Sequence, residues 1–371
     1  MPGLSPVRMH DSLMSSAQEN MQTTVTLAWA TVLGESVSDI CWSVDNGNLY
    51  AGSVSGELIA SDENGESLFI THTHSAAITS IKSQPQGNLI ATSGEDGKVH
   101  LSDASNGDLV ETVIDDQQWA EVINWSPDGS LLAGAVGKKV FVLDEKHQVE
   151  TWDGHPGIVG ALDWAPNGKR LASCTNKGVY LWNVGSWAPV KVLDFPGAGI
   201  TLAWNADGRA LAAGTQDGFM HLRLQMPGTT PRQLSMSGYP GKVACLDWNP
   251  SIKGNQYCIA TCGGNEVVLW YLQTKSGNRK AIPLRRHERA ITKLAWSADG
   301  TLLVSADRSG RICFWSANGD FEFDMELGSE VTALAWHPKD FKLAIGHIDG
   351  SLRLFSFESG TRKTRGSDST N

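Results

Sequence analysis

The feature that most constrains this chain is an internal repeat of about 42 residues. In seven units a tryptophan follows an aliphatic residue by two positions, and in one unit a serine takes its place. This tryptophan column consists of Trp42, Ser83, Trp125, Trp164, Trp204, Trp248, Trp296 and Trp336. A repeat of this length is typical of a unit of four strands that stacks against its neighbours, and the chain holds eight such units.

Each unit has the pattern of a small antiparallel meander. An aliphatic residue such as Ile40 stands two positions before the tryptophan column, and this alternation predicts a strand that packs into a core. Dipeptides such as Asp128-Gly129 follow in most units and favour tight hairpin turns. A second strand, a second turn such as Asp96-Gly97 and a third strand come next. The fold class is therefore predicted to be all-β.

Composition excludes several other classes of protein. Of the 371 residues 39 are glycine and 14 are tryptophan, and 41% are hydrophobic, which is typical of a folded chain rich in turns. The net charge of −10 argues against nucleic acid as a partner. Six cysteines are too few for a disulfide scaffold and are expected to be reduced. No apolar stretch reaches membrane-spanning length and no secretion signal is evident, so we expect no membrane partner and a cytoplasmic location.

These motifs resemble those of the WD-repeat β-propeller family, over about residues 22–357. The residues that match the family's structural motif lie before the inner strand, on the second strand, in the second turn and at the end of the third strand. They are His74, His155 and His287; Ser173 and Ser305; Asp96, Asp217 and Asp349; and Trp182, Trp270 and Trp315. The family's hydrogen-bonded set of Trp, Ser or Thr, His and Asp looks complete in no unit, since Asn176 and Ser309 stand near the Asp position of two units.

The resemblance implies a β-propeller of four-stranded antiparallel blades. Residues Thr23 to Leu33 match the segment before the last inner strand, so they would supply the outer strand of the last blade and close the ring. We therefore predict eight blades, with seven blades and one appended unit as the alternative. The predicted organisation is a flexible lead over residues 1–20, one propeller domain over residues 21–357 and a polar tail over residues 358–371.

The sequence shows no pattern that predicts catalysis, a cofactor or a metal centre. His72 and His74 alternate on a strand, but His74 already stands in the structural histidine column and further ligands are missing. Cys258 and Cys262 lie too far apart along one strand to bind one ion or to form a disulfide. Asp163 belongs to a unit that does not adjoin that of Asp247, so the two are not expected to form an acid/base pair.

A small group of residues is left over for partner binding. Trp119, Phe195 and Tyr239 occupy connections that enter inner strands, where the resemblance implies a partner-binding face, and exposed aromatic side chains often anchor interfaces. The alternative is that these rings only pack against a neighbouring blade. An arginine cluster that includes Arg286, Arg289 and Arg308 is expected near the same face, where it would receive an acidic or phosphorylated segment. The hypothesis is that the aromatic residues and the arginines line one rim.

The function that these observations favour is a non-catalytic scaffold or adaptor that binds other proteins on one face of the propeller. The resemblance carries most of this prediction, because a fold alone does not imply a function. The alternative is a propeller with a small-molecule or metal site in its central channel, as in a hydrolase or a metal-handling accessory protein. Bound metal in the purified protein would favour that alternative.

Overall fold

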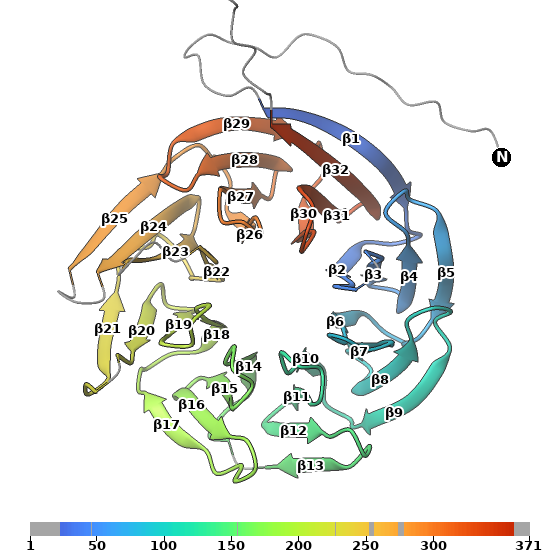
Figure 1. Cartoon of the computed structure of the whole chain (residues 1–371), viewed down its shortest axis with the longest axis horizontal. Coiled ribbons are helices and arrows are strands. Elements are labelled where there is room, and N and C mark those ends of the chain that lie inside the picture. The colour runs from blue at the N-terminus through green and yellow to red at the C-terminus, as the bar shows by residue number, and fades with distance from the viewer. Residues whose placement is uncertain are drawn as a thin grey trace, which may run out of the picture.

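The computed structural model describes residues 23–359, except residues 46, 154, 227, 252–255 and 274–277. The described residues form 32 strands in eight antiparallel sheets of four strands each. Figure 1 shows the sheets as blades around a common axis. The prediction of an all-β, eight-bladed ring is confirmed, and the seven-bladed alternative is wrong. No apolar helix of membrane-spanning length occurs among the described residues.

The blades are numbered in the chain order of their inner strands. Blade 1 comprises β2 (Val37–Trp42), β3 (Leu49–Ser53), β4 (Glu57–Ser61) and β5 (Ser67–His72). Blade 2 comprises β6 (Ile78–Ser83), β7 (Leu89–Gly94), β8 (Lys98–Asp103) and β9 (Leu109–Asp115). Blade 3 comprises β10 (Ala120–Trp125), β11 (Leu132–Val136), β12 (Lys139–Leu143) and β13 (Val149–Trp152). Blade 4 comprises β14 (Val159–Trp164), β15 (Arg170–Thr175), β16 (Gly178–Asn183) and β17 (Val190–Leu193).

The second half of the ring repeats this order. Blade 5 comprises β18 (Gly199–Trp204), β19 (Ala210–Thr215), β20 (Met220–Leu224) and β21 (Arg232–Met236). Blade 6 comprises β22 (Cys245–Trp248), β23 (Gln256–Gly263), β24 (Glu266–Gln273) and β25 (Arg279–Leu284). Blade 7 comprises β26 (Ile291–Trp296), β27 (Leu302–Asp307), β28 (Arg311–Ser316) and β29 (Phe321–Glu326). Blade 8 comprises β30 (Val331–Trp336), β31 (Lys342–His347), β32 (Ser351–Ser359) and β1 (Thr23–Val32).

Ring closure depends on β1, which comes from the start of the described chain. It pairs antiparallel with β32, from Thr23 opposite Ser359 to Val32 opposite Ser351. The predicted closing strand is therefore confirmed. Strand β32 continues to Ser359, two residues beyond the predicted end of the domain. The predicted lead over residues 1–20 lies outside the described residues, as does most of the predicted tail.

The tryptophan column joins most blades to the one before. In five blades the indole N–H donates to the backbone carbonyl of the residue that precedes the column in the preceding blade. These bonds are Trp42 to Ala335 (3.0 Å), Trp125 to Lys82 (3.2 Å), Trp164 to Asn124 (3.0 Å), Trp248 to Ala203 (3.0 Å) and Trp336 to Ala295 (3.2 Å). All seven indoles are buried, so the column contributes both apolar contact and a directional bond between blades.

The antiparallel order brings two kinds of connection to one side of the ring. Each inner strand begins on the side where the turn between the second and third strands lies, and we call this side the top face. The turns there need glycine because their backbone has a positive φ. At Gly97, with φ +78°, a Cβ atom would lie 1.9 Å from the carbonyl oxygen of Asp116 in the connection that enters the next blade. The glycine-rich turns thus pack closely against these connections.

Candidate partner-binding site

Blade 7 contains a complete chain of hydrogen bonds just beneath the top face. The indole N–H of Trp315 donates to Ser305 Oγ (2.9 Å), the Ser305 hydroxyl donates to His287 Nε2 (2.7 Å), and His287 Nδ1–H donates to Asp307 (2.9 Å). The expectation that no unit has the full set is therefore wrong. The carboxylate belongs to Asp307 at the end of β27. The family motif places it two residues later, at the position that Ser309 occupies.

The protonation states in blade 7 follow from burial and pairing. Burial lowers the pKa of His287, and the opposing effect of Asp307 does not restore it. Burial acts to raise the pKa of Asp307, but hydrogen bonds from Ser309 and His287 outweigh it and leave that pKa lowered. A neutral imidazole next to an ionised carboxylate satisfies every donor in the chain.

Blade 2 lacks only the tryptophan of this set. His74 Nε2 accepts a hydrogen bond from Thr92 (2.9 Å), and His74 Nδ1–H donates to Asp96 (2.9 Å). Ser102 stands where Trp315 stands in blade 7, because both pair with the second residue of the neighbouring second strand. The Ser102 hydroxyl is buried and has no hydrogen-bond partner among the described residues.

Blade 4 lacks the carboxylate. Trp182 Nε1–H donates to Ser173 Oγ (2.9 Å), and the Ser173 hydroxyl donates to His155 Nε2 (3.2 Å). Burial lowers the pKa of His155 to about 4, with no carboxylate to oppose it. The predicted structural roles of these three side chains agree with this geometry.

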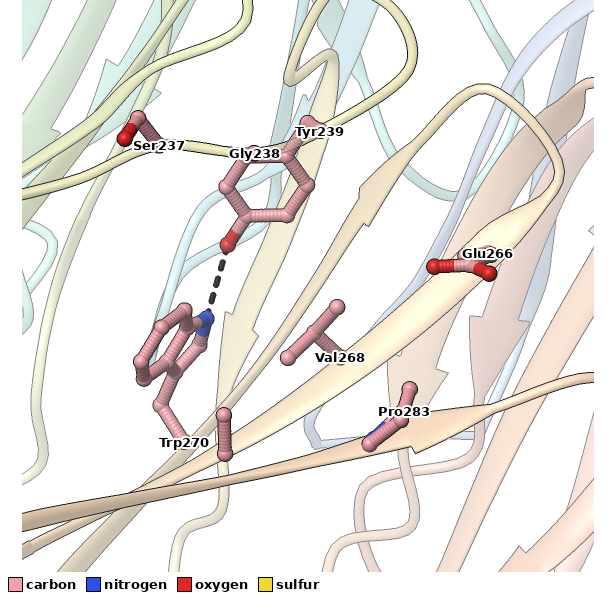
Figure 2. Close-up of a pocket in the computed structure, with 8 residues that line it drawn as sticks. Ser237, Gly238, Tyr239, Glu266, Val268, Trp270 and Pro283 are labelled. Carbon is pink, nitrogen blue, oxygen red and sulfur yellow. Dashed lines mark hydrogen bonds between the residues drawn. The ribbon is translucent and has the colours of Figure 1, made fainter.

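Tyr239 replaces the histidine in blade 6. Its hydroxyl accepts a hydrogen bond from Trp270 Nε1–H (2.7 Å) and lies 2.7 Å from Thr261 Oγ1, as Figure 2 shows for the bond to Trp270. Thr261 in turn donates to the carbonyl of Val268 (3.2 Å), so the tyrosine hydroxyl is the donor toward Thr261. Burial raises the pKa of Tyr239. The hydroxyl of this candidate is therefore used inside the blade, which corrects its assignment as a free aromatic anchor.

The expectation that Phe195 is an exposed anchor for a partner is also corrected, because its side chain is only 3% exposed. It stands four residues before the inner strand of blade 5, the position that His287 has in blade 7, and it stacks on His221 with ring centres 4.4 Å apart. With no histidine at this position, Asp217 instead accepts a bond from Thr215 within its own turn. Asp349 in blade 8 likewise accepts bonds from Ser351. These two predicted motif aspartates stabilise turns, and neither has a hydrogen bond to a histidine among the described residues.

Trp119 remains an exposed aromatic residue on the top face. Its side chain is 55% exposed, at the residue just before β10. The corresponding residue of blade 4 is Ile158, which is also 55% exposed. Ile158 was not among the residues predicted from the sequence, although its place one repeat after Trp119 is a signal that could have identified it. Two adjacent blades thus present one large apolar side chain each at the same position.

The arginine cluster lies on the same face over blade 7. Arg308 is 3.8 Å from Glu330, and Arg285 is 2.6 Å from Glu266. Arg286 lies over the ring of Phe321, 4.1 Å from its centre. Neither Arg286 nor Arg289 has an ion pair with any carboxylate in the described part of the chain, and both are exposed. Of Arg285, Arg286, Arg289 and Arg308, only Arg286 and Arg289 therefore have no described carboxylate partner.

The ring separates the two groups that the sequence analysis placed on one rim. Inner-strand contacts run in chain order around the ring, so blade 3 with Trp119 lies opposite blade 7 with Arg289. Figure 1 shows β10 and β26 on opposite sides of the axis. The hypothesis of one continuous rim is therefore wrong, and the top face has an apolar sector and a basic sector across the channel.

Three aspartates on the inner strands, Asp39, Asp163 and Asp247, accept hydrogen bonds from the backbone of a neighbouring blade. Asp39 accepts a bond from the N–H of Ile81 in the next blade (2.9 Å) and lies 3.6 Å from Lys82. Asp163 accepts from the N–H of Trp204 (2.8 Å). Burial raises the pKa of Asp163 to about 7, against the lowering effect of that bond. These carboxylates pin neighbouring blades together.

Asp247 repeats this arrangement in blade 6. Its carboxylate accepts a bond from the N–H of Trp296 (2.8 Å), and burial raises its pKa to about 7. It belongs to a blade two positions from that of Asp163, as the sequence analysis expected.

One group of side chains in the described part of the chain is compact enough to hold a metal ion. Atoms of His74, Asp96 and His100 lie within 4.8 Å of one another. Both ring nitrogens of His74 are already engaged, by Asp96 and by Thr92, and His100 Nδ1 lies 3.0 Å from Thr112 Oγ1. Hydrogen bonds within the blade account for this group without a metal.

The cysteines are all free thiols. Cys258 lies on the same strand as Cys262, but the partner opposite Cys262 is Cys245 on β22, a cross-strand pair that the sequence analysis did not consider. The two thiols share a hydrogen bond, which lowers the pKa of Cys245 and raises the pKa of Cys262. Cys245 Sγ also donates to the carbonyl of Thr292 (3.0 Å), which joins blades 6 and 7.

Comparison with known families agrees with the blade motifs. The family model described as "Anaphase-promoting complex subunit 4 WD40 domain" matches residues 40–128 and 315–367. The model described as "WD domain, G-beta repeat" matches residues 146–183 and 279–316. The second stretch of this match includes all four residues of the hydrogen-bonded set of blade 7.

Curated relatives match at low identity. "Cell division cycle 20.1, cofactor of APC complex" of Arabidopsis thaliana is 27% identical over 276 residues, 71% of this chain and 51% of that protein. "WD repeat-containing protein slp1" of Schizosaccharomyces pombe is 24% identical over 193 residues, 50% of this chain and 38% of that protein. "Actin-related protein 2/3 complex subunit 1A-A" of Xenopus laevis is 24% identical over 160 residues, 42% of each chain. The chain thus spans about half or less of the length of these relatives.

Among solved structures, the computationally designed Ika8 protein superposes with a TM-score of 0.73, over 88% of this chain and 97% of that one, at 22% identity. This likeness concerns the fold alone. The closed ring of eight four-stranded blades makes the chain a β-propeller. Its repeat motifs and the matching family models make it a WD-repeat protein.

Proposed function

We propose that this protein is a non-catalytic scaffold that holds partner proteins on the top face of its propeller. The observation that carries the proposal is the pair Arg286 and Arg289, two exposed cations without a described carboxylate partner on the top face of a protein of net charge −10. Trp119 and Ile158 add exposed apolar area across the channel. Basic and apolar groups on one face suit a partner with an acidic or phosphorylated segment.

The relatives support a role in assembly. One is named as a cofactor of the APC complex and another as a subunit of the actin-related protein 2/3 complex. The inner-strand carboxylates Asp39, Asp163 and Asp247 accept hydrogen bonds from backbone N–H groups of neighbouring blades, and this structural use of them favours a scaffold. We place the protein in the cytoplasm, on the strength of its six free thiols.

The experiment that tests this proposal is capture of partners from extract of the native host. The triple variant W119A/R286E/R289E is expected to lose most of the captured protein, at least tenfold by quantitative mass spectrometry, because it removes one anchor and reverses two charges. Its melting temperature should remain within about 2 °C of the wild type, since surface substitutions change stability little.

The matched control is K146E/K169E, which reverses two exposed charges on the opposite face. Equal capture by the wild type and the triple variant would contradict the proposal. Metal bound at one equivalent per chain in the purified protein would instead favour a site for metal chemistry.

A further inference from the structure

The groove beside the third-strand tryptophan recurs as a pocket in two blades. In blade 6 it is lined by Ser237, Gly238, Tyr239, Glu266, Val268, Trp270, Ala281 and Pro283. In blade 4 it is lined by Trp152, Asp153, His155, Pro156, Tyr180, Trp182 and Pro189. Trp182 corresponds to Trp270, and His155 corresponds to Tyr239, so the two pockets occupy the same place in the repeat.

The walls of the blade 6 pocket are apolar. Figure 2 shows Val268 and Pro283 beside the rings of Tyr239 and Trp270, with Glu266 at one end. The Tyr239 hydroxyl is used by Trp270 and Thr261, and Glu266 is paired with Arg285 at 2.6 Å. The pocket therefore offers two aromatic rings and aliphatic atoms, with its one carboxylate already neutralised.

The size of the pocket suits one side chain. Its volume is about 190 Å³, below the range of about 300–1,000 Å³ that is typical of small-molecule sites. An apolar side chain of a peptide fits this description better than a free cofactor or metabolite.

Basic groups lie in the top-face connections on either side of blade 6. Lys242 is exposed three residues after Tyr239, and Arg286 and Arg289 are exposed in the next connection of the ring. Glu288 lies exposed between the two arginines and offsets one of these three charges. The sector keeps a positive balance in an acidic protein, so it is complementary to an acidic segment.

The charges of the chain's own tail argue against it as the occupant. After Ser359 the sequence holds Arg362, Lys363 and Arg365 but only one acidic residue, Asp368, so like charges would meet at the arginines. The geometry points to another protein: we propose that the blade 6 pocket and the Arg286–Arg289 pair form one docking site for an extended acidic peptide. An apolar side chain of the peptide occupies the pocket, and its carboxylates contact the arginines. This inference rests on the proposed scaffold function and adds where the partner binds.

The test uses the full chain with ¹⁵N-labelled tryptophan and three peptides. The probes are Glu-Glu-Leu-Glu-Glu, the same peptide with Ala at its centre, and Lys-Lys-Leu-Lys-Lys. The leucine peptide is expected to shift the indole N–H signal of Trp270, which lies in the pocket, and to bind at least tenfold more tightly than either of the others. Binding should weaken as salt is added.

Two variants separate the parts of the site. Ala281 is exposed on β25, so A281W fills the pocket without disturbing the core. A281W and R286E/R289E are each expected to weaken binding of the leucine peptide at least tenfold, and K146E/K169E is expected to bind like the wild type. A signal assigned to Trp270 and an unchanged melting temperature show that each variant is folded.

Several results would overturn this inference. They are equal binding of the leucine and alanine peptides, unchanged binding by A281W, or binding that appears only after residues 1–21 are removed. The last would mean that the chain's own first segment fills the pocket. If host-extract capture is lost in W119A/R286E/R289E but retained in A281W, the scaffold function stands and only the docking site is wrong.

Discussion

At the residue scale, the same repeat position holds different side chains with different contacts in different blades. The position nine residues before the tryptophan column holds a hydrogen-bonded histidine in blade 7, a tyrosine in blade 6 and a buried phenylalanine in blade 5. In each case a ring fills the space beside the third strand, and the polar contacts adjust to what the neighbours offer. An aromatic residue in this position is therefore first a packing residue, and the sequence alone did not show that Phe195 is buried or that the Tyr239 hydroxyl is bonded inside its blade.

The hydrogen-bonded set of blade 7 predicts a specific loss of stability. Replacing Ser305 by Ala leaves the indole of Trp315 and Nε2 of His287 without partners in a buried place. Because each buried unsatisfied group costs about 1–3 kcal/mol, the free energy of unfolding should fall by about 2–4 kcal/mol. Chemical denaturation of wild type and variant measures this difference.

Ser102 provides the matched control, since its buried hydroxyl has no described partner. S102A is expected to leave stability unchanged or slightly higher. Similar losses in S102A and S305A would contradict the role assigned to the blade 7 set.

The channel carboxylates predict an unusual pH dependence. The pKa of Asp247 is about 7 in the folded protein, against about 4 in an unfolded chain, so between pH 4 and 7 the folded state binds more protons. The free energy of unfolding should therefore fall as the pH rises through this range. D247N keeps an oxygen acceptor for the N–H of Trp296 and removes the titration. Relative to the wild type, D247N should gain stability steadily from pH 4.5 to 7.5 in denaturation experiments.

The control for this prediction is Asp299, whose pKa is lowered. Burial acts to raise it, but hydrogen bonds from Ser297 and Thr301 prevail. A lowered pKa affects stability only below about pH 4, so D299N should differ from the wild type by a constant amount between pH 4.5 and 7.5. Parallel curves for D247N and the wild type would show that Asp247 titrates normally.

At the element scale, β1 has more influence than any other outer strand. The other seven outer strands follow their blades directly in the chain, whereas β1 joins the two ends of the ring. Without it, β32 would present an unpaired edge, which invites association with other chains. The first described strand is thus required to complete the last blade.

Removal of residues 1–33 is accordingly expected to lower the stability by several kcal/mol, roughly 10 °C in melting temperature, and to promote aggregation. A peptide of residues 22–34, added in trans, should restore part of the loss by pairing with β32. A chain that begins at residue 22 keeps β1 whole and serves as the control. A melting temperature that is unaffected by the loss of residues 1–33 would show that closure does not depend on β1.

At the scale of the whole molecule, an even number of blades sets which surfaces face each other. Blades 3 and 7 lie across the channel, so the apolar pair Trp119 and Ile158 is separated from Arg286 and Arg289 by the width of the ring. A compact partner motif can use one sector, and only a partner that spans the channel mouth can use both. Loss of capture by W119A alone, compared with R286E/R289E alone, would show which of these two modes a given partner uses.

The sequence by itself determined the repeat, the strand order within each blade, the blade count and the closing strand. Those features depend on short-range alternation, turn residues and periodic tryptophans, such as Trp42 and Trp336, which most units show locally. Only the tertiary structure decided which residues meet between units. It supplied Asp307 as the missing carboxylate, buried Phe195, bonded Tyr239 to Trp270, and set the apolar sector opposite the basic one. The reason is that burial, hydrogen-bond partners and position around the ring arise from contacts between distant segments, which a pattern along the chain does not contain.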